Sequence, residues 1–507
     1  MTKVSKALLI ISSTLLIFVG CRQNSGTKQA ENIVKLNGSG NYTISQGGTY
    51  DVSGKLTDGK LKVEADGDVV LILSGVEINN STDEAIKIES KGLTTIKSAD
   101  GSKNIITGSG DAAINAKSAI AFDGNGTLEI TGTAKHGVEC DTDITVNSGS
   151  INISSYEHGL KSKSIIKILG GTLNINAKTG KGIKADKEYI CEDGTITIVS
   201  PNNEGLESKG ALTINGGKYN ITAGEDGINA GTSEAAGNDI TNKGTDNIPE
   251  GNNNFRTGGE KAMNNGRPEM PEGFSPPDRF ETPPEVLTPP DGVEAQPQDF
   301  TPHGGSEIPP SDFVVPEGAT TSGRGIPFEH ERQKGGFGGM GMGMGMANEN
   351  SIVTINGGHI KINCTGDGID SNGSLTINGG TIIIDGPENS GNGPLDCDGQ
   401  MFINGGTVLT ASSRGMTQMP QSMSQGFINV SFTTPLSKGD EILIKDSANN
   451  TVTEHTVEKI CGILIYTSPE ISNGGEYRIY INGNEHSTVT ATDNAGSNQG
   501  FGRGGRF

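Results

Sequence analysis

Short apolar runs bounded by Gly or Asn recur along most of the chain. In residues 204–230 an acid-Gly-Leu-acid opening is followed by Leu-Thr-Ile-Asn-Gly-Gly and Tyr-Asn-Ile-Thr, and the opening then returns at Asp226-Gly227-Ile228. Alternating runs of this length, punctuated by turn residues, predict short β-strands separated by turns. The glycines of successive openings are 22 or 23 residues apart, at positions 137, 159, 182, 205 and 227.

A period near 22 residues with no helical pattern predicts an all-β fold, a parallel β-helix. Leucine-rich repeats have a similar period, but their fixed Leu and Asn positions are missing here. One coil cannot bury its Ile, Leu and Val side chains alone, whereas stacked coils form a continuous core. The repeated glycine is expected to supply a turn that needs a positive φ.

The pattern divides the chain into repeat and non-repeat segments. A Pro- and Gly-rich stretch cannot bury enough apolar surface to order itself, so we expect a long disordered insertion within the repeat. Alternating strands after the last repeat predict a small β cap. The predicted segments are a signal peptide (1–21), a spacer (22–32), the N-terminal part of the β-helix (33–230), the insertion (231–350), the C-terminal part of the β-helix (351–426), the cap (427–486) and a disordered tail (487–507).

The first 21 residues read as a targeting segment. Lys3 and Lys6 precede an apolar run that ends at Cys21, in a sequence similar to a bacterial lipoprotein box. The alternative is an ordinary secretory signal with an incidental cysteine. A lipidated Cys21 would tether an extracellular, cell-surface protein to a bacterial membrane without spanning it.

Composition narrows the function. The chain has 77 Gly, no Trp and 4% aromatic residues, which suits stacked layers of small apolar side chains. A formal charge of −21 argues against a nucleic-acid partner and is compatible with cation binding. The cysteines form neither a disulfide framework nor a zinc pattern. Cys140 and Cys397 occupy a repeat position that elsewhere holds Ala or Ser, so we expect them to be small buried residues.

Two columns of side chains are expected to line up along the stacked coils, because equivalent positions in adjacent coils lie about 4.8 Å apart. One column precedes the repeated glycine, and the other lies two residues after it. Their basic members, on two adjacent coils, are His158, Lys161, Lys181 and Lys184. The acidic side chains on the following coils are Glu204, Glu207, Asp226, Asp367, Asp370, Asp396 and Asp398.

Like charges stacked this closely are destabilising unless something neutralises them. Clustered carboxylates suit Ca²⁺, which takes roughly six to eight oxygen ligands, so we predict that the acidic set binds calcium and the basic set contacts substrate. The alternative is an ordinary solvated face. No catalytic motif is evident. Lys161 and Lys184 could abstract a proton beside a uronate, as in a lyase, if a lysine pKa were lowered.

Several phrases resemble the bacterial cell-surface carbohydrate-binding domain family, which has a right-handed parallel β-helix akin to family 9 polysaccharide lyases. They are residues 41–44, 75–78, 226–230, 367–380 and 444–447, and the resemblance covers roughly residues 33–485. It implies binding of acidic plant polysaccharide such as polygalacturonate, or of cellulose, together with calcium. The sequence favours such a binding protein over an enzyme. A pectate-lyase-like enzyme and a structural surface adhesin are the alternatives.

Overall fold

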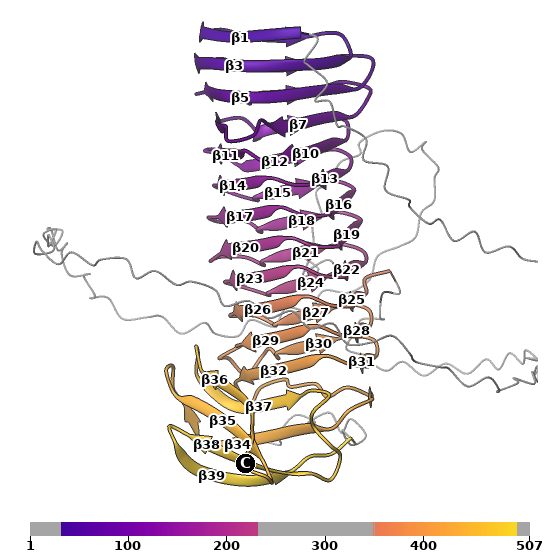
Figure 1. The fold of residues 1–507 in the computed structure, drawn as a ribbon, viewed down its shortest axis with the longest axis vertical. Helices are drawn as coiled ribbons and strands as arrows, with labels where there is room; N and C mark the ends of the chain where they lie inside the picture. Colours follow the sequence, from indigo (N-terminus) through magenta and orange to yellow (C-terminus); the bar gives the residue numbers. More distant parts are fainter. Residues whose placement is uncertain (1–31, 232–347, 349, 494–507) are drawn as a thin grey trace, which may run out of the picture. The chain divides into compact units, whose positions relative to one another are not determined.

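The computed structural model describes residues 32–231, 348 and 350–493 (Figure 1). Nearly all of the predicted signal peptide and spacer, most of the predicted insertion, and residues 494–507 of the predicted tail lie outside these ranges. The described part of the chain is built from β-strands. It contains no helix that is long and apolar enough to cross a membrane.

Most strands belong to a parallel solenoid in which each complete coil contributes three short strands (Figure 1). The first ladder of strands is an 11-stranded parallel sheet. Its strands are β2 (Tyr42–Ile44), β4 (Leu61–Val63), β6 (Ile86–Ile88), β9 (Ala112–Ala116), β12 (His136–Cys140), β15 (Leu160–Ser162), β18 (Ile183–Ala185), β21 (Leu206–Ser208), β24 (Ile228–Ala230), β27 (Ile369–Ser371) and β30 (Leu395–Cys397).

The other two ladders belong to one larger sheet, because the long strand β5 pairs with both of them. The N-terminal long strands are β1 (Asn32–Ser39), β3 (Gly48–Asp58) and β5 (Val69–Asn80). The second ladder continues with β7 (Thr94–Ser98), β10 (Ile120–Gly124), β13 (Ile144–Val146), β16 (Ile165–Ile168), β19 (Glu188–Cys191), β22 (Leu212–Ile214), β25 (Val353–Ile355), β28 (Leu375–Ile377), β31 (Met401–Ile403) and β33 (Ser422–Met423). The third has β8 (Lys103–Gly108), β11 (Thr127–Gly132), β14 (Ser150–Ser155), β17 (Thr172–Ala177), β20 (Thr195–Ser200), β23 (Lys218–Ala223), β26 (His359–Cys364), β29 (Thr381–Asp385) and β32 (Thr407–Ser412).

The coils that precede and follow residues 232–347 in the sequence are direct neighbours in the stack. Strands β22, β23 and β24 pair in parallel with β25, β26 and β27. Ile228 therefore sits directly over Ile369, and both side chains are fully buried. The predicted parallel solenoid with coils of about 22 residues is confirmed.

An antiparallel region follows the last coil. Strands β34 (Phe427–Leu436) and β37 (Cys461–Thr467) pair with each other, and β37 also pairs antiparallel with β32. A separate four-stranded antiparallel sheet has the order β36 (Thr451–Thr456), β35 (Glu441–Asp446), β38 (Glu476–Ile481) and β39 (Asn484–Thr490). This is the small C-terminal β structure that the alternating pattern predicts.

Repeated apolar side chains form one continuous core inside the coils. Cys140 and Cys397 are buried there as free thiols, at the position that Ala or Ser holds in other coils, as predicted. The expectation for the repeated glycine is wrong. Gly205 does not adopt a positive φ; instead, an added Cβ would overlap the Ile221 Cγ2 methyl and approach the Gly227 carbonyl oxygen. Close packing between coils therefore excludes any side chain at this position.

Candidate metal centre and charged ladder

The strand register places the predicted site residues on adjacent rungs of the first ladder. The column that lies two residues after the repeated glycine runs Lys161, Lys184, Glu207, Asn229 and Asp370, and Asp396 pairs with Asp370 on the last rung. The other column, just before the glycine, is tied together by side chains that accept backbone N–H groups from the next coil. Asp226 Oδ1 accepts the Asp367 N–H at 2.7 Å, and Asp367 Oδ1 accepts the Gly393 N–H at 2.6 Å.

Three of the predicted metal ligands converge at one point of this ladder. Asp226, Asp367 and Asp370 each offer a carboxylate oxygen, and these oxygens lie within 4.8 Å of one another. Burial, with the neighbouring carboxylates adding to it, raises the pKa of Asp370 to about 8. Burial likewise raises the pKa of Asp367 to about 7 and raises the pKa of Asp226. Each of these two carboxylates accepts a backbone N–H group, which lowers its pKa, but burial has the larger effect. The ionised forms are therefore destabilised unless a cation joins them.

The surroundings of these carboxylates fit a hard cation. Asn229 lies beside Asp370 in the register, is 1% exposed, and donates its amide N–H to Asp226 Oδ2 at 3.1 Å. Its carbonyl oxygen Oδ1 is buried and has no hydrogen-bond partner among the described residues. A buried oxygen without a donor is costly, and carboxylate and amide oxygens are the ligands that Ca²⁺ takes. We refer to Asp226, Asp367, Asp370 and Asn229 together as the acidic cluster.

Glu204 and Glu207 are placed differently from the acidic cluster. Both residues are 1% exposed, and both form ion pairs with Lys181. The Lys181 Nζ atom lies 3.0 Å from Glu204 Oε1. Lys184 Nζ lies 3.8 Å from Glu207 Oε1. The boundary between the basic and the acidic sets is thus a compact group of ion pairs, and these two glutamates face lysines. Burial, followed by repulsion from Lys181 and Lys209, lowers the pKa of Lys184.

The last two predicted metal ligands lie at the end of the ladder. Asp396 is hydrogen-bonded by the Gln418 side-chain amide, and the Gln418 carbonyl oxygen accepts the Cys397 N–H at 3.3 Å. Burial raises the pKa of Asp396. Asp398 is exposed on the next turn. Gln418 therefore covers the final carboxylate of the column and the edge of β30.

The remaining basic residues form a buried polar group. The imidazoles of His136 and His158 stack with a centroid distance of 4.8 Å, and His158 Nδ1 accepts the Lys181 N–H at 2.9 Å. Lys161 Nζ lies 2.9 Å from Glu139 Oε1 and 3.1 Å from His136 Nε2. Burial, then repulsion from the adjacent positive charges, lowers the pKa of His136 to about 4 and that of His158 to about 2. His158 is therefore a neutral ladder residue at neutral pH.

We expect the neutral histidine pair to make the fold sensitive to acid. An unfolded imidazole has a pKa near 6.5, so the unfolded state binds more protons and stability falls as pH drops below about 6.5. Each imidazole can contribute at most about 1.4 kcal/mol per pH unit down to its folded pKa. His158→Gln, which keeps a side-chain acceptor, should flatten the decrease in urea midpoint between pH 7 and pH 5. An unchanged pH dependence in this variant would contradict the assignment.

The sequence pattern assigns no role to two of the contacts described above or to one further group of side chains. Asn229 lies in the predicted column, but the direction of its side-chain amide, which leaves Oδ1 without a hydrogen-bond donor, is not visible in the sequence. Gln418 belongs to no repeat and reaches Asp396 across 22 residues of sequence. The group His136, Glu157 and His158 also brings potential ligand atoms within 4.8 Å of one another. His136 and His158 each precede the repeated glycine, so their alignment on adjacent coils can be read from the sequence.

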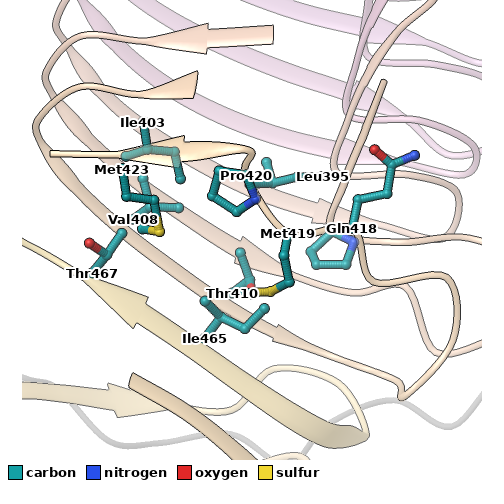
Figure 2. Close-up of a pocket in the computed structure, with 11 residues that line it drawn as sticks. Leu395, Ile403, Val408, Thr410, Gln418, Met419, Pro420, Met423, Ile465 and Thr467 are labelled. Atoms are coloured by element: carbon teal, nitrogen blue, oxygen red, sulfur yellow. The ribbon is translucent and has the colours of Figure 1, made fainter. Parts of the chain in front are cut away.

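A small, mostly apolar cavity lies at the C-terminal end of the solenoid, and its lining includes Leu395 of β30 and Gln418. Its volume is about 10 Å³, roughly that of one water-sized probe. Figure 2 shows Met419 and Met423 among the side chains that surround it, together with Ile465 from β37. The cavity is a packing gap where the coils meet the antiparallel strands, and its volume is too small for a ligand larger than about one water molecule.

The fold and the site together define a class of protein, a parallel β-solenoid with a charged ladder that includes a group of metal-competent carboxylates. Residues 38–200 match the family described as carbohydrate-binding domain-containing protein. These N-terminal coils are thus similar to the family that the resemblance in the sequence predicts.

Individual relatives cover different shares of the molecule. A carbohydrate-binding domain-containing protein from Acetivibrio thermocellus is 28% identical over 126 residues. The match covers 22% of this chain and 44% of the relative, so the chain spans less than half of that protein's length. The solved structure of the polysaccharide lyase-like protein from C. thermocellum, a gadolinium derivative, aligns over 72% of this chain and 87% of that one, with 19% identity. Its TM-score of 0.28 is too low to carry an argument.

Proposed function

We propose that this protein binds an acidic polysaccharide of the polygalacturonate type along its charged ladder, with Ca²⁺ held by the acidic cluster. The observation that carries the proposal is the convergence of Asp226, Asp367 and Asp370 within 4.8 Å. The family match of residues 38–200 supports carbohydrate as the ligand class. We further propose that the protein works outside the cell, tethered to the membrane through a lipid on Cys21.

The residues of the acidic cluster have complementary roles in this proposal. Three carboxylates and the Asn229 Oδ1 carbonyl would hold the ion, and the backbone N–H groups of Asp367 and Gly393 would keep two of the carboxylates in place. When bound, calcium supplies positive charge and open coordination positions for a uronate carboxylate. Lys184, on the basic side of the ladder, offers a further cation to the same chain of uronates.

Calorimetry with polygalacturonate, in calcium and in excess chelator, tests this proposal. We expect binding in calcium and at least tenfold weaker binding after chelation, because the bridging charge is lost. Cellulose is the uncharged comparison and should bind equally with and without chelator, if it binds. Affinity for polygalacturonate that does not change on chelation would rule out the calcium bridge. Affinity for no glycan at all would favour a structural adhesin.

Lyase activity is a second candidate because one observation favours it. A lysine that acts as a base needs a lowered pKa, and burial lowers that of Lys184. Incubation with polygalacturonate while unsaturated product is followed in the ultraviolet separates the two functions. Product formation that Lys184→Met abolishes would establish an enzyme, whereas binding without product supports the binding protein.

A further inference from the structure

Tyr156 is an exposed aromatic residue in the turn between β14 and β15. Its residue exposure is 48%, and it is the aromatic member of the large exposed hydrophobic residues in the described ranges. A single exposed hydrophobic residue is ordinary on a protein surface. Its meaning therefore depends on what surrounds the ring.

A lysine from the next coil accompanies this ring. Lys178 Nζ lies 5.4 Å from the Tyr156 ring centroid, in cation–π geometry. Within the described ranges, no carboxylate lies within ion-pair distance of Lys178, whereas the nearby Lys135, Lys161 and Lys181 all have such partners. Lys178 therefore retains a positive charge that an incoming anion can approach.

The two turns that carry these side chains are held in place by hydrogen bonds. The Thr179 hydroxyl donates to the Tyr156 carbonyl oxygen at 2.6 Å, and the Asn202 amide donates to the Lys178 carbonyl oxygen at 2.7 Å. Backbone N–H groups of Lys178 and Thr179 donate to the preceding coil as well. A preformed surface loses less conformational entropy when a ligand binds to it.

The position of the pair relative to the ladder is set by the chain. Tyr156 precedes His158 by two residues, and Lys178 precedes Lys181 by three. His158, Lys181, Glu204 and Asp226 occupy successive coils, so Tyr156 stands about 14 Å and Lys178 about 10 Å along the stack from Asp226. A single sugar cannot reach both places, but a polymer that follows the ladder can.

We infer that Tyr156 and Lys178 form a second contact site for a polyuronate chain, distinct from the acidic cluster. The inference rests on the proposed function. The apolar C–H face of a sugar ring would leave water by packing on the tyrosine ring, while the Lys178 ammonium would pair with the uronate carboxylate. An aromatic ring beside an available ammonium suits an acidic sugar better than a neutral one.

Calorimetry in calcium with digalacturonate and octagalacturonate tests the second contact. We expect Tyr156→Ala to weaken octamer binding about tenfold, while dimer binding at the acidic cluster and calcium affinity stay unchanged. Tyr156→Phe should bind as the unmodified protein does, because the ring is kept. Lys178→Gln should weaken octamer binding and make it less sensitive to salt. Leu169→Ala removes a comparably exposed apolar side chain elsewhere, 45% exposed, and should change nothing.

The outcomes separate this inference from the proposed function. Octamer binding by Tyr156→Ala that equals that of the unmodified protein would overturn the second contact while leaving the calcium site intact. Equal loss for dimer and octamer would also overturn it, because the effect would then lie at the acidic cluster. Failure of the unmodified protein to bind either oligomer would contradict the proposed function and this inference together.

Discussion

The double substitution Asp367→Asn and Asp370→Asn is expected to weaken calcium binding at least a hundredfold, about 2.7 kcal/mol. Each change keeps the side-chain shape but removes one of the three charges that meet within 4.8 Å. The apo protein should lose no stability, because burial and mutual repulsion disfavour the ionised carboxylates and raise the pKa of both. Calorimetric titration with calcium measures the first effect, and thermal unfolding in chelator measures the second.

Two single substitutions sharpen this result. Asp398→Asn changes a predicted ligand that is exposed outside the acidic cluster, and we expect calcium affinity to change little. Asp66→Asn removes an exposed carboxylate that pairs with Lys91 at 2.7 Å on a distant coil, and it controls for loss of surface charge. Undiminished calcium affinity in the double variant would refute the acidic cluster as the metal site. A loss in Asp398→Asn as large as in the double variant would instead favour the broader set that the sequence predicts.

Gly205→Ala is expected to destabilise the solenoid by roughly 3 kcal/mol, at the upper end of what overpacking usually costs. The new methyl would overlap the Ile221 Cγ2 methyl and lie 2.7 Å from the Gly227 carbonyl oxygen. Neither neighbour can move freely, because Gly227 belongs to the next coil and Ile221 is fully buried in the core. Thermal and urea unfolding followed by circular dichroism should both show a lower midpoint.

Gly67→Ala is the matched control for this substitution. An added Cβ at Gly67 meets nothing within 4 Å, and its backbone is not in the left-handed region, so the midpoint should stay unchanged or rise slightly. If Gly205→Ala were as stable as Gly67→Ala, close contact between coils would not be the reason for glycine at this position. The comparison removes the general effect of replacing glycine by alanine from the measured difference.

Much of the fold follows from the sequence because the same residues recur at a constant spacing. A period of 22 or 23 residues sets the length of a coil, and alternation within each short run sets which side chains point inward. The columns that contain Lys184 and Asp370 follow from that register, and the strand pairs place them as predicted. Gly205 was recognised as special for the wrong reason, since backbone conformation and contact with the next coil are not distinguishable from one sequence.

The solenoid, the phase in which it resumes at Val353, and the order of charges along the ladder all follow from the repeated residues. Which carboxylates are available to a cation depends on how the side chains pack between coils. Glu204 and Glu207 lie on the coil next to Lys181, and both form ion pairs with its ammonium. Asp226 and Asp367 have shorter side chains that stay beside the backbone of the next coil, so their charges meet that of Asp370. Whether a carboxylate meets a lysine or other carboxylates depends on the length and direction of its side chain between coils. The register of the strands alone does not predict this.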